Sequence, residues 1–280
     1  MPAQLIDGKL VAARMRARLR NARLALGERP VRLVSLEIGQ NPAAAVYVRN
    51  QQRAAAECGI DMEVHNLPVD TDQSRLIAHI AQLNARQEVA GVIVQRPLPP
   101  GIDPRSIQSA IDPRKDVEGM HPENMGAILY REPLFPPCTA AAAQQLILET
   151  GIDLRGAETV VVGHSEIVGK PIAVLLLHHL STVTVCHIGT RKLIDHTRRA
   201  DILVVAVGKA GLVHGDMVKP GAVVIDIGIN QGADGKITGD VDFASACAVA
   251  SHITPVPGGV GPVTVAMLLR NTLRAAGAKV

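Results

Sequence analysis

The chain has 280 residues, of which 47% are hydrophobic, and a formal net charge of only +3. This length accommodates one large or two ordinary domains, and the apolar content can fill a core, which excludes a disordered chain. The basic residues are scattered, and no aromatic residue interleaves with the arginines at 14, 16, 18 and 20, so we expect no nucleic-acid partner. No apolar stretch is long enough to span a bilayer and the N-terminus lacks a secretory signal pattern, so we expect a cytoplasmic protein without a membrane partner.

Four cysteines are isolated along the chain, at Cys58, Cys138, Cys186 and Cys247. None has the spacing of a metal-binding cluster, so we predict no metal. Cys186 and His187 together are a conceivable ligand pair at a strand end, but a small buried thiol is the favoured interpretation. The spacing predicts reduced cysteines.

The first half of the chain alternates strand and helix patterns. Apolar residues recur at helical spacing after Asp7, which is a plausible N-cap, and short apolar runs bounded by turn residues separate the later helices. In chain order we predict a helix over 7–26, a strand over 31–38, a helix over 43–58, a strand over 60–67, a helix over 72–84 and a strand over 90–95. This alternation is typical of a parallel sheet with right-handed crossovers.

Irregular segments follow the strand that ends at Gln95. Residues 96–104 form a Pro-rich loop, and residues 112–119 hold three carboxylates and two cations in a second irregular stretch. Prolines at 133, 136 and 137 then break the chain before a helix predicted over 139–150. We place the domain boundary in that break.

The second half opens on a strand, a glycine turn, a helix and another strand. Residues 159–162 are β-branched, Gly163 permits a sharp turn, Ser165 can cap the helix expected over 172–180, and the next strand covers 182–186. Two further buried strands over 201–208 and 222–228 also end in glycine. Although any α/β protein needs glycine at a tight βα turn, four such strands favour a nucleotide-binding domain with ligand at the carboxyl ends.

The chain closes with a stiff loop and an apolar helix. Residues 251–264 are rich in proline and glycine and feed a helix that we expect to end near Ala276. The bare backbone N–H groups of such a loop are suited to a ligand cleft.

Taken together, these segments resemble one family over nearly the whole chain: the bifunctional methylenetetrahydrofolate dehydrogenase/methenyltetrahydrofolate cyclohydrolases. The N-terminal signatures are Tyr47-Val48, residues 91–95, Lys115-Asp116-Val117 and Pro137-Cys138-Thr139. The C-terminal signatures are residues 163–169, 182–187, 226–230, 239–243 and 255–262, of which the last reads Pro-Val-Pro-Gly-Gly-Val-Gly-Pro. That run is too long and too specific to match the family by chance.

The resemblance implies a two-domain α/β fold with a cleft between the domains. An N-terminal α/β folate domain would comprise residues 1–137 plus 262–280, and a Rossmann-type NAD(P)-binding domain residues 138–261. It further implies a tetrahydrofolate derivative as substrate, NADP as cofactor with NAD also conceivable, and a homodimer.

The resemblance also assigns roles to residues of this sequence. The catalytic positions would be Gln51, Gln95 and Glu118. Substrate would contact Tyr47, Val94, Arg96, Asp116, Pro257, Gly258, Gly259, Gly261 and Thr264. The dinucleotide would contact Gly163, His164, Ser165, Val168, Ile188, Arg191, Gly208 and Ile229.

Three substrate-side positions depart from the family pattern. The family places a lysine, its principal cyclohydrolase residue, where this chain has Gln51. An amide orients water but does not titrate, and loss of a general acid–base group costs ~10²–10⁴ in rate. We therefore predict surviving dehydrogenase activity with weak or absent cyclohydrolase activity. Glu118 stands where the family has a shorter acid, and Arg96 stands where it has a small apolar residue. An enzyme that acts on a modified folate therefore remains an alternative.

The cofactor side departs as well. An arginine of the glycine turn is His164 here, and a serine after the second strand is Ile188. Both family residues help to hold the NADP 2′-phosphate, and Arg191, Lys192 and a protonated His164 can take over that contact. No acidic residue follows the second strand to bind a free ribose, so NADP is favoured over NAD.

Three functions remain open from the sequence. The first is NADP-dependent oxidation of 5,10-methylenetetrahydrofolate, the second a related reaction on a different pterin or imine, and the third a folate-binding or dimer-partner protein without catalysis. Because folding requires neither the dinucleotide turn nor the segment from Gly258 to Gly261, their retention favours an enzyme.

Overall fold

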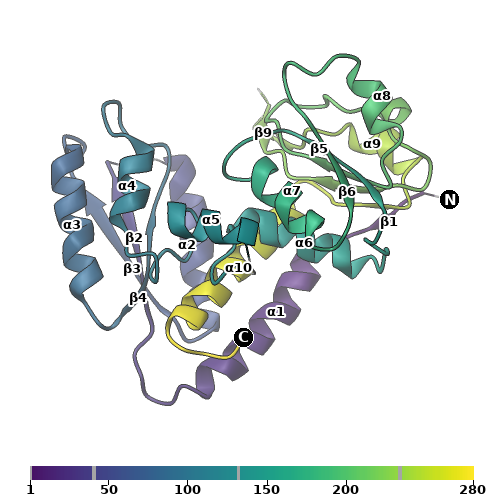
Figure 1. Cartoon of the computed structure of the whole chain (residues 1–280). Coiled ribbons are helices and arrows are strands. Elements are labelled where there is room, and N and C mark those ends of the chain that lie inside the picture. The colour runs from purple at the N-terminus through teal and green to yellow at the C-terminus, as the bar shows by residue number, and fades with distance from the viewer. Residues whose placement is uncertain (1, 40–41, 131–132, 233–234) are drawn as a thin grey trace. The chain divides into compact units, whose positions relative to one another are not determined.

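The computed structural model describes the whole chain except residues 1, 40–41, 131–132 and 233–234 (Figure 1). The chain forms two compact units. The six-stranded unit comprises Met1–Ala12 and Pro137–Thr264, and the three-stranded unit comprises Ala13–Pro136 and Val265–Val280. Each has a parallel sheet with helices, which confirms the predicted two-domain α/β class. Among the described residues, no helix has the length and apolarity needed to cross a bilayer.

The six-stranded unit has the strand order β1-β11-β8-β7-β5-β6, and every pair in this sheet is parallel. Its strands are β1 (Gln4–Leu5), β5 (Glu158–Val162), β6 (Thr182–Cys186), β7 (Ile202–Val205), β8 (Val223–Asp226) and β11 (His252–Ile253). Its helices are α6 (Cys138–Glu149), α7 (Gly169–Leu177), α8 (Leu193–Thr197), α9 (Phe243–Cys247) and the 3-10 turn η1 (Gly215–Met217). A small antiparallel pair, β9 (Asn230–Gln231) and β10 (Ile237–Thr238), stands apart from the sheet.

Strand alternation divides the core of this unit into two layers. Val160, Val162, Leu203 and Val205 pack on one face with Ala246 of α9 and its neighbours. Helices α6 and α7 pack against each other and contact strands β8 and β5 (Figure 1). The sheet is thus covered on both faces, as its uninterrupted apolar strands predict.

The three-stranded unit has the order β3-β2-β4, again parallel throughout. Its strands are β2 (Arg32–Ile38), β3 (Asp61–Leu67) and β4 (Val89–Val94). Its helices are α2 (Pro42–Glu57), α3 (Gln73–Ala85), α4 (Pro104–Ala110) and α5 (Pro122–Tyr130), joined by parts of α1 (Gly8–Leu24) and α10 (Val260–Ala275).

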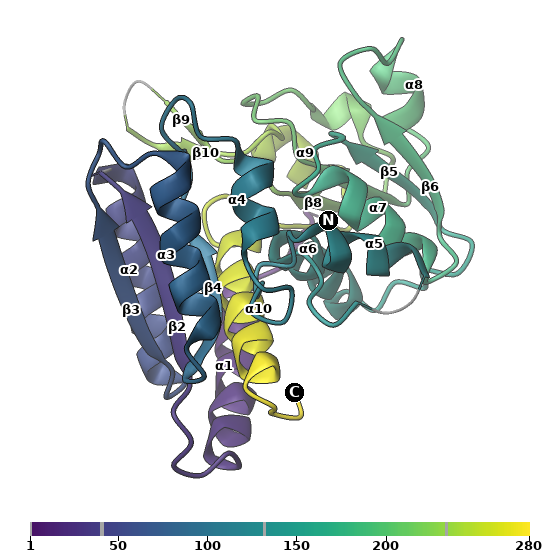
Figure 2. The ribbon, with the colours of Figure 1, turned by 60° about the vertical axis from the view of Figure 1, so that its left-hand side comes forward.

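The two faces of this sheet have different characters. Val34 and Leu36 of β2 pack with Val92 and with Leu76 of α3 in a fully apolar cluster. The alternate positions of β2 point to the other face, and α2 and α3 lie on opposite sides of the sheet (Figure 2). The α2 side is the one that carries polar residues at the strand ends.

Several elements differ from the sequence expectations. Helix α7 begins at Gly169, earlier than the predicted 172, and ends at Leu177, since Leu180 has a positive φ of 62°. Helix α10 begins at Val260 and β11 lies at His252–Ile253, so both start inside the stretch 251–264 that was predicted as loop. Helices α4 and α5 were not predicted. Asp103 accepts the backbone N–H groups of Arg105 and Ser106 and so starts α4 within a Pro-rich stretch.

The first twelve residues group with the six-stranded unit. Backbone pairing explains this, because Gln4 and Leu5 of β1 are in register with His252 and Ile253 of β11. The predicted boundaries place residues 1–12 with the other domain. The functional assignment of each unit stays a prediction.

Candidate functional site

The carboxyl end of β4 carries a hydrogen-bonded set of neutral polar side chains. Gln95 follows β4 directly, and its Nε2 donates to Ser35 Oγ at 3.0 Å and to Gln51 Oε1 at 3.1 Å. Ser35 is fully buried and Gln51 is 3% exposed. Both amide hydrogens of Gln95 are therefore taken, which fixes its carbonyl oxygen as the group available to a ligand. Two predicted catalytic residues, Gln51 and Gln95, are in direct contact.

Tyr47 stands one turn before Gln51 on α2. Residues four apart share a helix face, so the ring lies on the same side of α2 as Gln51. Its side chain is 41% exposed, which leaves aromatic surface open for stacking.

Two carboxylates follow β4 in the stretch that was predicted as irregular. Asp116 is fully buried and accepts hydrogen bonds from Gln108 Nε2 at 3.3 Å, from the backbone N–H of His121 at 2.7 Å and from Asn124 Nδ2 at 2.9 Å. Its oxygens are thus committed to joining α4 and α5. Few lone pairs of the Asp116 carboxylate therefore remain for the predicted contact with substrate.

Glu118 is half-buried and differs in character. Burial, the largest cause, and the charge of Asp116 together raise its pKa from 4.5 to about 7, although Arg96 and a hydrogen bond with the Val94 backbone oppose the rise. A carboxyl group with a pKa near 7 exchanges protons readily at physiological pH. Its properties suit the predicted catalytic role.

The remaining predicted residues of this unit divide between core and surface. The Val94 side chain is buried in the apolar cluster beneath α3, so only its main chain is available at the strand end. Arg96 is exposed and precedes a cis proline, Pro97.

In the six-stranded unit, the turn between β5 and α7 depends on two glycines. Gly163 has a φ of +121°, and a Cβ there would clash with the Ala206 carbonyl oxygen. A Cβ on Gly169 would clash with the carbonyl of Gly163. Ser165 Oγ accepts from the N–H groups of Val168 at 3.2 Å and Gly169 at 3.4 Å, so it closes the turn that leads into α7. The N-cap position itself is Val168, so the prediction that Ser165 is the cap was wrong, because α7 begins four residues after Ser165. The helix N-terminus thereby comes close to the strand end, as anion binding requires.

The neighbouring strand ends carry the other predicted dinucleotide residues. The rings of His164 and His187 lie 5.0 Å apart between centroids. Ile188 and Arg191 are exposed after β6, and Ile229 is 70% exposed after β8. Because β5 pairs with β6 and β7 on its two sides, these loops meet at the carboxyl edge of one sheet.

Two buried aspartates that the sequence analysis gave no role hold these loops in place. Asp240 accepts the backbone N–H groups of Val207, Gly208 and Lys209 at 2.6 to 2.9 Å. Asp226 at the end of β8 accepts the N–H groups of Gly228, Asp240 and Val241 at 2.9 to 3.0 Å. The aspartates in the signatures 226–230 and 239–243 were visible in the sequence. Only the fold shows that Asp226 holds the loop of Asp240 and that Asp240 in turn holds the loop after β7.

The glycine-rich segment near the C-terminus lies in the six-stranded unit. Gly258 has a φ of +109°, Val256 and Pro257 are joined by a cis peptide bond, and a Cβ on Gly8 would clash with the Gly259 carbonyl oxygen. Gly261 opens onto free space, and Thr264 Oγ1 donates to the Val260 carbonyl at 3.2 Å. The segment is therefore held against the start of α1.

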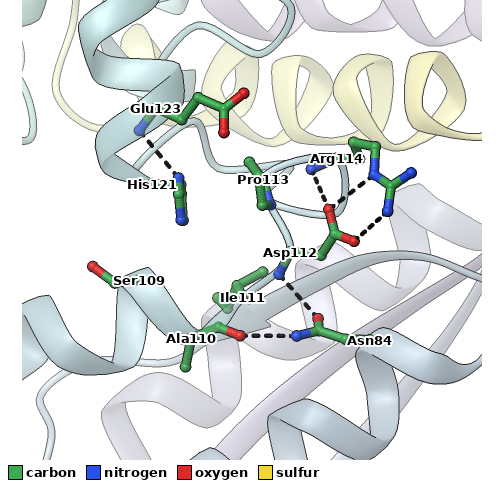
Figure 3. A pocket seen from close by; sticks show the side chains of 9 residues that line it. All are labelled: Asn84, Ser109, Ala110, Ile111, Asp112, Pro113, Arg114, His121 and Glu123. Atoms are coloured by element: carbon green, nitrogen blue, oxygen red, sulfur yellow. Dashed lines mark hydrogen bonds and ion pairs between the residues drawn. The ribbon is translucent and has the colours of Figure 1, made fainter.

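A cavity of about 560 Å³ lies elsewhere in the three-stranded unit (Figure 3). Asp112 pairs with Arg114 at 2.8 Å on its wall, and Asn84 bridges the Asp112 N–H and the Ala110 carbonyl. None of the predicted site residues lines it. Across the described part of the chain, no group of three or more His, Cys, Asp or Glu side chains is arranged to hold a metal ion.

A profile for the tetrahydrofolate dehydrogenase/cyclohydrolase catalytic domain matches residues 6–118, and one for the NAD(P)-binding domain of the same family matches residues 137–280. The chain is 53% identical over 277 residues to bifunctional protein FolD 2 of Mesorhizobium japonicum, covering 97% of this chain and 90% of that protein. It is 50% identical to bifunctional protein FolD of Moorella thermoacetica, covering 99% of each.

Solved structures agree. The bifunctional FolD enzyme of Campylobacter jejuni is 42% identical, with a TM-score of 0.96 and coverage of 98% and 99%. The Trypanosoma brucei enzyme, solved with NADP and an inhibitor, is 38% identical with a TM-score of 0.93, covering 98% of this chain and 97% of that one.

Proposed function

The chain belongs to the tetrahydrofolate dehydrogenase/cyclohydrolase family, and on this ground we propose that it oxidises 5,10-methylenetetrahydrofolate to 5,10-methenyltetrahydrofolate with NADP. The three-stranded unit supplies the folate side, and the six-stranded unit supplies the dinucleotide side. The names of close relatives support this reaction, and the glycine turn at Gly163 supports dinucleotide binding.

Hydride transfer places light demands on the folate side. The methylene carbon must be held near the nicotinamide, and the protein contributes mainly by positioning. Gln95, fixed by Ser35 and Gln51, presents one carbonyl oxygen to the substrate. Tyr47 adds a stacking surface on the same helix as Gln51.

We further propose that the cyclohydrolase activity is weak. The related enzymes of Campylobacter jejuni and Trypanosoma brucei carry both activities in their names, which favours both here. The observation against the second activity is the Gln51–Gln95 hydrogen bond of 3.1 Å. It puts a non-titrating amide where the resemblance implies a lysine amine. Methenyl hydrolysis needs a water made nucleophilic and protons moved, and an amide does neither.

Purified protein tests both activities. Mixed with NADP and 5,10-methylenetetrahydrofolate, it should form NADPH, and loss of methenyl absorbance should stay close to the uncatalysed rate. Gln51→Lys should raise hydrolysis roughly 10²-fold or more by restoring a general acid–base group. Gln52→Lys, one position along the same helix, is the matched control and should leave hydrolysis unchanged. Rapid methenyl hydrolysis by the unmodified protein would refute the second proposal and leave the first intact.

NADP is the proposed cofactor because cations follow β6. Arg191 and Lys192 are exposed beyond that strand, and His164 lies against His187 at the β5 end. Residues 187–192 contain no acidic side chain to bind the ribose hydroxyls of NAD. Steady-state kcat/KM with each cofactor decides the matter: we expect NADP to be preferred at least tenfold, equal to about 1.4 kcal/mol, and an NAD preference would reverse the assignment.

A further inference from the structure

Glu37 lies beside the Gln95 side-chain set. It occupies β2, the middle strand, two positions after Ser35, so both side chains point to the same face of the sheet. The N–H of Gln95 donates to the Leu36 carbonyl at 2.9 Å, which continues the β2–β4 register and sets Gln95 alongside Glu37. The face thus presents Ser35, Glu37 and Gln95 together at the carboxyl end of the sheet.

The carboxylate of Glu37 is incompletely satisfied. Its Oε1 is buried, and no described residue gives it a hydrogen bond. No ion pair of Glu37 with a lysine or arginine occurs among the described residues either. A buried acceptor without a donor costs about 1–3 kcal/mol, and a charged one costs more. Such a cost is tolerated where a ligand completes the interaction.

The neighbouring side chains cannot supply the missing positive charge. Both amide hydrogens of Gln95 go to Ser35 and Gln51, and Gln51 is itself neutral. An amine at position 51, as the resemblance implies, would have offered a cation on this face. The chain instead combines a neutral residue at 51 with a carboxylate at 37, and the face has negative polarity.

The proposed oxidation creates positive charge at one place. The C–H bond of the methylene bridge breaks, its electron pair leaves as hydride to the nicotinamide, and the oxidised cofactor is reduced. The carbon left between two nitrogens becomes an amidinium cation, and no proton is released. A fixed carboxylate in a water-poor site stabilises such developing charge strongly.

We propose that Glu37 faces the one-carbon bridge and stabilises the cation that forms as hydride departs. The inference rests on the proposed oxidation and assigns a charge-stabilising residue to the same site. It also assigns a preference: the site binds the cationic methenyl form more tightly than neutral reduced folates.

The Glu37→Gln variant tests this preference, since it keeps the shape and removes the charge. Dissociation constants are measured by rapid mixing for methenyltetrahydrofolate, whose one-carbon bridge is cationic, and for tetrahydrofolate, which has no bridge and is neutral at the two nitrogens. We expect the variant to bind the cation about tenfold more weakly and the neutral ligand within about twofold. The kcat of oxidation should fall about tenfold with KM nearly unchanged.

Two further variants keep the result interpretable. Glu37→Asp retains the charge and should keep most of the preference for the cation. Glu57→Gln removes a surface carboxylate that pairs with Arg16 at 2.9 Å, and it should change neither ratio. Ligand-free Glu37→Gln should melt no lower than the unmodified protein, because the carboxyl oxygen that it replaces is buried and makes no hydrogen bond.

An unchanged ratio of cation to neutral affinity in Glu37→Gln overturns the inference. Failure of the unmodified protein to reduce NADP overturns the proposed function instead, and the binding ratio still reports on Glu37. The two failures are therefore distinguishable.

Discussion

At the scale of single residues, two carboxyl groups hold their protons tightly. Burial raises the pKa of Glu118 to about 7 and that of Asp226 to about 6. In Asp226 three backbone N–H groups oppose the rise, whereas Glu118 has one backbone contact and the exposed Arg96. Asp226 is therefore a structural group that ties loops, and Glu118 has the properties of a proton-exchanging group.

The raised pKa of Glu118 predicts a pH dependence of stability. The folded state holds this proton more tightly than the unfolded state, so its contribution is complete below about pH 4.5 and is lost as the pH rises through about 7. The free energy of unfolding, measured with denaturant at pH 5, 6 and 7.5, should therefore fall relative to that of Glu118→Gln. Asp226 is common to both proteins and cancels in this difference. A difference that is flat or rises with pH would contradict the assignment.

At the scale of elements, the turn between β5 and α7 is the most constrained. Gly163→Ala forces a Cβ against the Ala206 carbonyl at a φ of +121°, a conformation that costs about 2 kcal/mol even without the clash. We expect a lower melting temperature and at least tenfold weaker NADP binding, measured by calorimetry.

Gly126→Ala is the control for that experiment. Gly126 lies in α5 with nothing near its Cβ position, and alanine there should stabilise by up to about 1 kcal/mol. Normal NADP affinity in Gly163→Ala would show that the dinucleotide does not depend on this turn.

Local patterns predicted the long elements well. The strands β2 and β6 and the helices α1 and α3 lie within two residues of their predicted bounds, because apolar periodicity and flanking turn residues determine them. The short elements were not predicted. Helices α4 and α5 span seven and nine residues, too few for periodicity to identify them, and the two-residue β1 exists only through pairing with β11.

The candidate site, too, could be predicted from the sequence only in part. Motifs indicated Gln51, Gln95 and Gly163, and the fold then brought Gln51 and Gln95 within 3.1 Å. No motif singled out Ser35 or Glu37, because within an apolar strand a polar residue is only an interruption of the pattern. Their role depends on which face of β2 meets α2, a tertiary fact that local pattern does not contain.

At the scale of the whole molecule, neither unit is a continuous stretch of chain. The six-stranded unit needs residues 1–12 as well as 137–264, and β1 covers an edge of its sheet by pairing with β11. A fragment of residues 137–280 lacks that strand and leaves β11 as an open edge.

This arrangement predicts the behaviour of fragments. Residues 137–280 expressed alone should aggregate or melt over a broad range, whereas the intact chain should show a sharp transition by circular dichroism. A fragment of residues 1–136 lacks residues 265–280 of its unit and should behave likewise. A sharp, reversible transition in either fragment would show that the missing segment is dispensable.

The division of the chain between its units also sets the order of events on the ribosome. The three-stranded unit begins early in the sequence, yet its last segment, residues 265–280, is synthesised after all of the six-stranded unit. The six-stranded unit is incomplete until residue 264 has been synthesised, although its first strand leaves the exit tunnel much earlier. Until residues 265–280 have been synthesised, the nascent three-stranded unit lacks part of its packing and exposes apolar surface, which favours aggregation during that interval.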